Sequence, residues 1–274
     1  MRYLVLGSAG QIGKPLTRYL SELGHDVTTF DIKDSREQDL RKANNMLLEK
    51  AVQATDFVFF LAWDVGGSKY LSKYQDSYDF IYNNLAIMTN VFDVLRKCSK
   101  PFVFVSSQMS DIHESSYGLT KRIGEKISKS LNGLVVKLWN VYDYEDEEEK
   151  SHVITDFICA ASVGEDIKML TDGNEYRQFL HASDCVKCFY TLSNCYAELD
   201  KSKEYHITSF EWTTIKDLAQ IVADNFGVNV IPGPATDTIQ FGHKVEPDTV
   251  ILNYWKPTTT LDQGVKLVIK EMTK

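Results

Sequence analysis

Near its start the sequence reads Tyr3-Leu4-Val5-Leu6-Gly7-Ser8-Ala9-Gly10-Gln11-Ile12-Gly13. An apolar run typical of a strand leads directly into three glycines spaced Gly-x-x-Gly-x-x-Gly, and a helical pattern follows. Gly7 permits the tight turn, Gly10 lets the backbone approach a pyrophosphate, and Gly13 lets the helix pack closely on the strand. The N-terminus of the helix offers free N–H groups to the anion. The stretch therefore predicts a dinucleotide-binding turn.

Apolar β-branched runs alternate with amphipathic stretches through the first half of the chain. Strands are expected at residues 3–6, 27–30, 57–61, 102–105 and 134–138, and helices at 12–23, 40–51, 81–96 and 117–131. This alternation predicts an α/β fold, a Rossmann-type doubly wound parallel sheet formed by residues 1–140. Helical periodicity returns at 153–163, 185–195, 214–226 and 261–272. Residues 141–274 are expected to form a smaller α/β substrate lobe that shares the same core.

The composition excludes several classes of partner. Lys and Arg total 30 against 38 Asp and Glu, which gives the 274 residues a net charge of −8. Without clustered basic residues, nucleic acid and anionic membranes are not expected partners. The longest apolar runs are far shorter than the roughly 20 residues that a membrane-spanning helix needs. The chain enters its first strand at once, with no leader pattern, so a cytoplasmic location is expected.

The five cysteines form an odd set that fits a reducing compartment. Cys185 and Cys188 are spaced as a CxxC motif, for which a zinc or redox site is the alternative to buried packing thiols. No metal site is expected. The acidic run from Glu145 to Glu149 is interpreted as a solvated loop, with a functional acidic patch as its alternative.

Asp31 ends the second expected strand, 24 residues after Gly7. A carboxylate at this position accepts hydrogen bonds from the adenosine ribose and repels a 2′-phosphate, so NAD is favoured over NADP. Lys33 and Arg36 lie nearby, and their positive charges favour NADP instead. Farther on, Asp39 either approaches the adenine amino group or caps the next helix.

Tyr117 and Lys121 form a YxxxK motif whose spacing puts both side chains on one helical face. A tyrosine has an ordinary pKa near 10, so a neighbouring ammonium that stabilises the phenolate makes it usable as a base. Taken alone, the motif also fits two surface residues. Together with the glycine turn and Asp31, it favours a catalytic pair.

With these motifs the chain resembles the extended short-chain dehydrogenase/reductase family, in particular its NAD-dependent epimerase/dehydratase group acting on nucleotide-linked sugars. Residues 57–63 resemble the third-strand motif of that family, and Asn84 its cofactor-contacting asparagine. The resemblance implies that Ser107 hydrogen-bonds the reacting oxygen, beside Tyr117 and Lys121 as the other catalytic residues. The residues then expected to contact NAD are Gly7, Gly10, Gln11, Ile12, Gly13, Asp31, Asp39, Leu40, Leu61, Ala62, Asn84, Tyr117 and Lys121.

The resemblance extends to the expected substrate lobe. Within the family, Val65-Gly66-Gly67, residues 79–85 and residues 151–154 are most similar to the GDP-fucose synthase and GDP-mannose 3,5-epimerase branches, which suggests a GDP-sugar. His152 corresponds to an acid of the fucose synthases; its alternative is a histidine with a structural hydrogen bond at a helix start. The implied substrate contacts are Ser107, Gln108, Asn140, His152, Val153, Arg177 and His181.

Two departures narrow the chemistry that the resemblance implies. Gln108 stands where those two branches carry a catalytic cysteine and where sugar 4,6-dehydratases carry an acid, and an amide cannot take a proton from carbon. The segment from Ser107 to Tyr117 is also shorter than in most extended members. We therefore expect an open or differently built wall there.

What remains is hydride transfer at one carbon, expected at C4 of the sugar ring, with Tyr117 as the base and NAD retained in the site. The outcome is a 4-epimerase or a 4-dehydrogenase; a 4-keto-sugar reductase using NAD(P)H and a catalytically silent dinucleotide sensor are the alternatives. Family members commonly dimerise through the helices matching residues 81–96 and 117–131. We therefore expect a homodimer with a nucleotide-sugar substrate.

Overall fold

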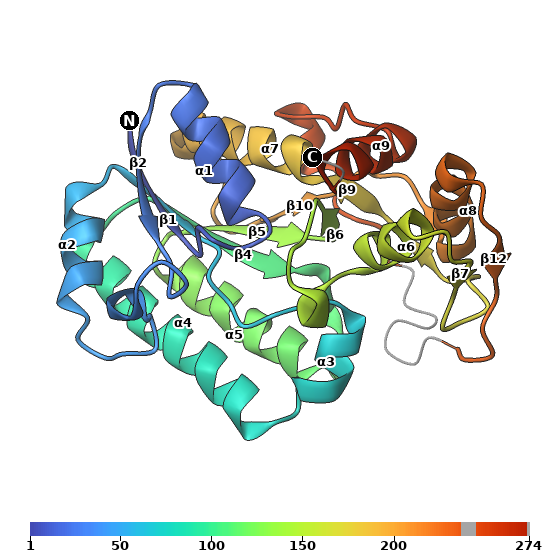
Figure 1. Cartoon of the computed structure of the whole chain (residues 1–274). Coiled ribbons are helices and arrows are strands. Elements are labelled where there is room, and N and C mark those ends of the chain that lie inside the picture. Colours follow the sequence, from blue (N-terminus) through green and yellow to red (C-terminus); the bar gives the residue numbers. More distant parts are fainter. Residues whose placement is uncertain (237–244, 273–274) are drawn as a thin grey trace.

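The computed structural model describes residues 1–236 and 245–272, arranged around one parallel sheet (Figure 1). Its strands are β1 (Arg2–Leu6), β2 (Asp26–Phe30), β3 (Phe57–Phe60), β4 (Phe102–Ser107), β5 (Leu134–Leu138) and β10 (Glu204–Ile207). They lie in the order β10-β5-β4-β3-β1-β2, and every neighbouring pair is parallel. The predicted doubly wound α/β fold is confirmed.

Two helical layers cover the sheet because its central strands β1, β3 and β4 are apolar on both faces. Tyr3, Val5 and Phe59 point into the layer formed by α1 (Gly13–Glu22) and α7 (Ala182–Asn194). Leu4, Leu6 and Phe60 point into the opposite layer. That layer consists of α2 (Met46–Ala54), α4 (Tyr78–Cys98) and α5 (Ser116–Ser130). The shift by one residue moves a side chain from one layer to the other, as the strand period requires.

The second half of the chain builds a separate small core beside the sheet (Figure 1). Its helices are α6 (Val153–Ser162), α8 (Ile215–Phe226) and α9 (Leu261–Met272). Short strand pairs flank them: β6 (Asn140–Tyr142) with β9 (Phe179–His181), β8 (Tyr176–Arg177) with β11 (Thr213–Thr214), and β7 (Ile167–Lys168) with β12 (Val230–Ile231). Because α7 and β10 come from this half yet belong to the sheet layers, the expected two lobes are interleaved; the boundary at residue 140 stays a prediction.

Short helices complete the described chain: α3 (Ser68–Tyr74) and the 3₁₀ turns η1 (Arg36–Gln38), η2 (Gln108–Asp111), η3 (Glu148–Lys150), η4 (Tyr196–Glu198) and η5 (Val250–Asn253).

The start of α2 corrects one prediction. The helix expected from residue 40 begins at Met46, where Asn45 accepts hydrogen bonds from the backbone N–H groups of the first turn. The side chain of Leu40 is buried although it lies in the preceding loop, which is why it extended the apparent helical pattern. Asp39 is not the cap of this helix. Its carboxylate instead pairs with Arg41 at 2.8 Å.

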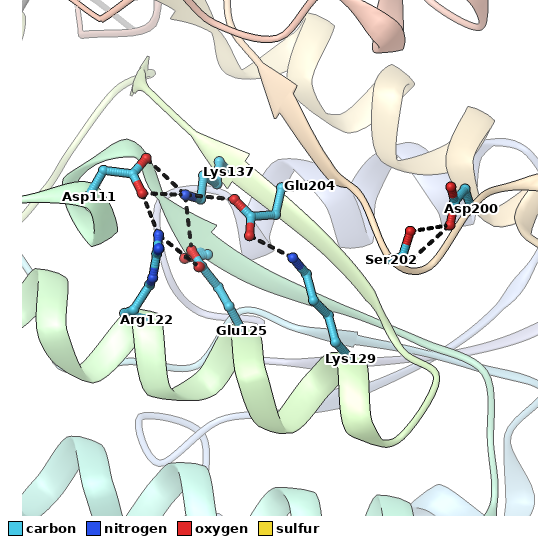
Figure 2. Close-up of polar contacts among 9 residues, drawn as sticks. Asp111, Arg122, Glu125, Lys129, Lys137, Asp200, Ser202 and Glu204 are labelled. Carbon is cyan, nitrogen blue, oxygen red and sulfur yellow. Dashed lines mark hydrogen bonds and ion pairs between the residues drawn. The ribbon is translucent and has the colours of Figure 1, made fainter.

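A cluster of charged side chains joins the sheet to the elements that carry the site (Figure 2). At its centre Lys137, on β5, is 1% exposed, and its Nζ lies 2.9 Å from Asp111 of η2 and 2.7 Å from Glu204 of β10. Glu125 of α5 lies 3.6 Å away, and Ser106 donates a hydrogen bond to it at 2.6 Å. Burial lowers the pKa of Lys137, but its bonds to Glu204 and Asp111 outweigh this and raise it. These residues, here called the Lys137 cluster, fasten η2 and α5 to the sheet.

The CxxC motif lies inside α7, where Cys185 and Cys188 are both fully buried. Burial raises the pKa of both thiols, so they are packing residues rather than reactive thiolates. All five cysteines are free. Within the described ranges, no three His, Cys, Asp or Glu side chains are grouped so that they could hold a metal ion. The helices of the described chain also lack the length and apolar content needed to cross a bilayer.

The Lys137 cluster predicts a specific loss of stability in acid. Burial raises the pKa of Glu204, but the bonds and charges of Lys129 and Lys137 outweigh burial and lower it to about 2, against an ordinary value of 4.5. Its stabilising contribution, about 2–3 kcal/mol, is therefore present at neutral pH and lost as the pH falls from about 5 to about 2. In urea titrations across that range, Glu204→Gln should have a lower free energy of unfolding than the wild type at neutral pH. That free energy should also fall less as the pH is lowered. Glu198→Gln, at an exposed glutamate, is the control; an identical profile for both variants would contradict the assignment.

Candidate functional site

A cleft of about 1140 Å³ runs along the carboxyl ends of the sheet strands. Its walls come from the loops after β1, β2, β3 and β4 on one side and from the segment between β6 and α6, with β7 and β8, on the other. This is the edge at which ligands of open α/β sheets bind.

The cleft gathers most of the residues that the sequence singles out. Those that line it are Gly7, Gly10, Gln11, Ile12, Gly13, Asp31, Asp39, Leu40, Leu61, Ala62, Ser107, Gln108, Tyr117, Lys121, Asn140, His152, Val153 and Arg177. Two others, Asn84 and His181, lie outside the lining.

Asn84 supports the cleft from behind. It is fully buried on α4, accepts a hydrogen bond from Asp64 N at 2.8 Å and donates one to Asp64 O at 3.0 Å. Its amide thus fixes the loop that follows β3. His181, also buried, stands at the start of α7, where its Nδ1 accepts from Ser183 N at 3.2 Å. In the structure each of these two residues holds backbone in place.

The glycine turn has the geometry of an anion cradle. A Cβ added to Gly13 would come within 2.0 Å of the carbonyl oxygen of Gly7, so α1 sits against the turn more closely than a side chain would allow. A Cβ on Gly10 would meet only that same oxygen, at 3.3 Å, which leaves its backbone open to the cleft. No side chain caps α1. In its first turn Lys14 N donates to Gly10 O at 3.0 Å and Pro15 has no N–H, so among the described residues the N–H of Gly13 remains for a ligand. Gln11 adds a buried Nε2 with no partner among the described residues. The turn fits the pyrophosphate of a dinucleotide.

Asp31 follows β2 and faces the same turn. Its Oδ2 accepts a hydrogen bond from Ala9 N at 3.0 Å, and its own N–H donates to Gln38 Oε1 at 2.7 Å. These bonds fix the carboxylate at the lip of the cleft, one strand away from the glycine turn. The position suits a ribose hydroxyl donor.

Ser107 and Tyr117 meet at the floor of the cleft. Tyr117 is 8% exposed, and burial raises its pKa to about 12, while a hydrogen bond with the Ser107 side chain acts in the opposite direction. Ser107 also accepts from Met109 N at 3.2 Å, which orients its hydroxyl. Both hydroxyl groups are therefore placed to form hydrogen bonds with the same oxygen atom of a ligand.

The short connection between these two residues is compact. It forms η2 and one further turn, and Ser115 caps α5 by accepting from Gly118 N at 3.0 Å. Gly118 makes this possible, because a Cβ there would lie 2.1 Å from the carbonyl oxygen of Met109. The first turn of α5 thus packs directly on η2. Asp111 of η2 is held in addition by the Lys137 cluster, so the short segment is built differently from a long loop but still aligns Ser107 with Tyr117.

Lys121 lies one turn beyond Tyr117 and is 3% exposed. Its Nζ donates to Val105 O at 2.8 Å and stands 3.8 Å from the ring centroid of Trp63. Burial lowers the pKa of Lys121 well below its ordinary value, and the charge of Glu125 opposes this. An aromatic face so close favours the ammonium form. Trp63 ends the segment that resembles the third-strand motif and lines the cleft, but it was not among the residues expected to contact NAD or substrate.

The substrate-lobe wall presents polar groups to the cleft. Asn140 donates to Gln178 O at 3.1 Å, and Arg177 donates to Tyr176 O at 2.8 Å. His152 starts α6 and its Nδ1 lies 2.7 Å from Glu145 Oε1. His152 therefore has the structural hydrogen bond of its alternative interpretation and also borders the cleft.

A second polar group in the cleft was not expected from the sequence. Asp64 accepts a hydrogen bond from the hydroxyl of Tyr70 at 2.7 Å and pairs with Lys150 at 3.1 Å. The link joins α3 to the segment before α6. Sequence patterns give no signal for it because its partners come from three separate elements.

Comparison with known proteins agrees with this geometry. Residues 3–208 match the model of the NAD dependent epimerase/dehydratase family, so most of the chain lies inside the family domain. Among curated relatives, the probable GDP-L-fucose synthase 1 of Oryza sativa subsp. japonica is 26% identical over 82% of this chain and 77% of its own length. The GDP-mannose 3,5-epimerase 1 of Oryza sativa subsp. indica is 24% identical over 97% of this chain and 80% of its own.

Solved structures of this family share the fold. The UDP-glucose 4-epimerase of Thermotoga maritima, solved with UDP-glucose, superposes with a TM-score of 0.83 at 19% identity, covering 100% of this chain and 99% of the other. The UDP-glucose 4-epimerase of Thermus thermophilus, in complex with NAD, gives 0.79 at 19% identity with the same coverage. The chain belongs to the NAD-dependent epimerase/dehydratase family, and its cofactor is NAD.

Proposed function

We propose that this chain is an oxidoreductase that acts at C4 of a nucleotide-linked sugar, as a 4-epimerase or a 4-dehydrogenase. The observation that carries the proposal is the meeting of Ser107, Tyr117 and Lys121 in one cleft. A hydroxyl donor, a phenol and a buried amine at this spacing suit proton transfer to and from an alcohol oxygen.

In the proposed reaction, the phenolic oxygen of Tyr117 takes the proton of the sugar C4 hydroxyl. Ser107 donates a hydrogen bond to the same oxygen as it becomes a carbonyl. Because burial raises the pKa of Tyr117 to about 12, the phenolate needs a nearby positive charge. Lys121 supplies it, with its Nζ 5.9 Å from the centroid of the Tyr117 ring. The glycine turn and Asp31 would hold NAD, which would supply the hydride acceptor for C4.

Gln108 limits the chemistry to one carbon. It borders the cleft directly after Ser107, and a carboxamide cannot abstract a proton from carbon at neutral pH. Epimerisation at C3 and C5 or elimination of water would need such a base. Oxidation at a single carbinol needs none beyond Tyr117.

The cleft has the size and the groups for a sugar nucleotide. Pockets for one drug-sized ligand measure about 300–1000 Å³, and this cleft, at about 1140 Å³, lies above that range. Arg177 brings a guanidinium suited to phosphate, and Asn140 an amide. Two relatives are named for GDP-sugars, so a GDP-sugar is the first substrate to test.

We also propose that two copies of the chain associate through α4 and α5. Tyr78 and Tyr82 of α4 are 76% and 54% exposed, and their rings stack at 5.7 Å. Leu119 and Ile123, one turn apart on the neighbouring α5, are 44% and 45% exposed. Apolar side chains gathered on two adjacent helices suit a helical interface with a second copy.

Replacement of the proposed base tests the mechanism. Tyr117→Phe should lower turnover of GDP- or UDP-sugars by at least about 100-fold and leave NAD binding unchanged, because the lost hydroxyl serves the sugar oxygen. Turnover is followed by NMR of the C4 epimers and by NADH absorbance. Tyr254→Phe, outside the cleft lining, is the matched control. Full activity of the Tyr117 variant would exclude the mechanism, and activity only with NADPH and a 4-keto sugar would point to a reductase.

The glycine turn gives a prediction on cofactor binding. A methyl group at Gly10 meets little protein but occupies the open face of the cradle, so Gly10→Ala should fold normally and bind NAD about tenfold or more weakly. Gly24 is the converse control: its φ is +78° with no atom within 4 Å of an added Cβ. Gly24→Ala should lose about 1–2 kcal/mol of stability and keep its NAD affinity. Calorimetry with NAD and thermal unfolding distinguish the two; equal NAD affinity for Gly10→Ala and the wild type would refute the cradle.

The interface is tested by sedimentation. The wild type should sediment as a dimer of the 31.2 kDa chain at micromolar concentration, and Ile123→Glu as a monomer, because a charge would have to be buried in the contact. Leu267→Glu, at a 47% exposed position on α9, should remain dimeric. A wild type that sediments as a monomer would contradict the proposed interface.

A further inference from the structure

The acidic run Glu145 to Glu149, here called the acidic strap, is anchored to other elements along its length. It follows β6 and leads into α6, where Figure 1 draws it in front of the sheet edge. At one end Glu145 accepts a hydrogen bond from His152 N at 2.8 Å. At the other end Glu149 accepts from the hydroxyl of Tyr74 on α3 at 2.6 Å. The run is a loop with exposed or half-buried side chains, as interpreted from the sequence, but these side chains also bind other elements.

The middle of the strap reaches the nucleotide-binding turn. Asp146 pairs with Lys14, in the first turn of α1, at 2.9 Å. Glu147 pairs with Lys33, which follows β2. All four side chains belong to residues that line the cleft. The strap therefore crosses from the substrate lobe to the two loops that would hold a dinucleotide.

Of the cations near Asp31, Lys33 and Arg41 line the cleft and both are paired, whereas Arg36 lies outside the lining. Lys33 has Glu147 as its partner, and Arg41 has Asp39 at 2.8 Å. Asp31 and Asp146 lie close enough to Lys33 for their charges also to raise its pKa. Lys33 and Arg41 thus each already have a carboxylate partner within the described residues.

The chemical difference between NAD and NADP would lie beside Asp31 and Lys33. NADP carries one additional phosphate on the 2′ oxygen of the adenosine ribose, and proteins that bind it provide Arg or Lys there. A cation already paired with a carboxylate offers little to a phosphate, and a nearby unpaired carboxylate oxygen repels it. Of the two residues whose charge favoured NADP in the sequence, Lys33 is paired with Glu147 of the acidic strap, and Arg36 is outside the cleft lining.

We propose that Asp146 and Glu147 of the acidic strap are specificity-determining residues that select NAD against NADP from the opposite wall of the cleft. They hold Lys14 and Lys33 and add negative charge where a 2′-phosphate would lie. The proposal concerns the dinucleotide alone and is independent of the sugar on which the protein acts.

The test is a comparison of dinucleotide affinities. After charcoal treatment to remove co-purified nucleotide, the full chain is titrated calorimetrically with NAD⁺ and with NADP⁺. The double variant Asp146→Asn/Glu147→Gln should bind NADP⁺ about tenfold more tightly relative to NAD⁺ than the wild type does, because one or two repulsive charges are removed. Added salt should reduce this difference between the proteins through screening.

Glu148→Gln is the matched control. It removes one negative charge from the same strap, where the double variant removes two, but Glu148 is outside the cleft lining, so the ratio of the two affinities should stay that of the wild type. An unchanged ratio in the double variant would overturn the proposal. An equal shift in Glu148→Gln would also overturn it, because the effect would then come from net charge alone. Sugar turnover is not part of the readout, so failure here is distinct from failure of the proposed reaction.

Discussion

The contact between the start of α1 and the end of β1 is the constraint on which the site depends. Gly13 lies so near the turn that any Cβ would overlap the carbonyl oxygen of Gly7, and a Cβ on Gly7 would in turn lie 2.7 Å from Ala62 N after β3. Three elements meet there through backbone alone. Because the resulting cradle consists of N–H groups, its attraction for an anion needs no lysine or arginine. A chain with a net charge of −8 can therefore hold a dinucleotide.

The elements and most of the cleft residues were predictable because they depend on local rules. The apolar runs gave the first five strands of the sheet, and the spacing of the YxxxK motif gave the shared face of Tyr117 and Lys121. The start of α2 was misplaced because a buried loop residue, Leu40, mimics helical periodicity. The cofactor contact expected of Asn84 stays a prediction, whereas its hydrogen bonds to the Asp64 backbone were not predictable, because a motif names a residue without fixing where its amide points.

Charge pairs between residues far apart in the sequence could not be predicted for a different reason. Lys14 and Asp146 are 132 positions apart, and no periodicity relates them. The same holds for the Lys137 cluster, whose members come from η2, α5, β5 and β10. Burying such charges costs free energy unless every partner is present. The cluster consequently favours one arrangement of η2 against α5, and with it one position of Ser107.

The strand β10 has a consequence for the synthesis of the chain. It is the last strand of the sheet in sequence, yet it pairs with β5 in the middle of the chain. Until α7 and β10 leave the ribosome, the nascent sheet has an unpaired edge at β5 and an uncovered apolar face that includes Val103 and Leu134. Such edges recruit other strands. A chain interrupted before β10 therefore exposes the β5 edge and part of the core to other chains and is prone to aggregate.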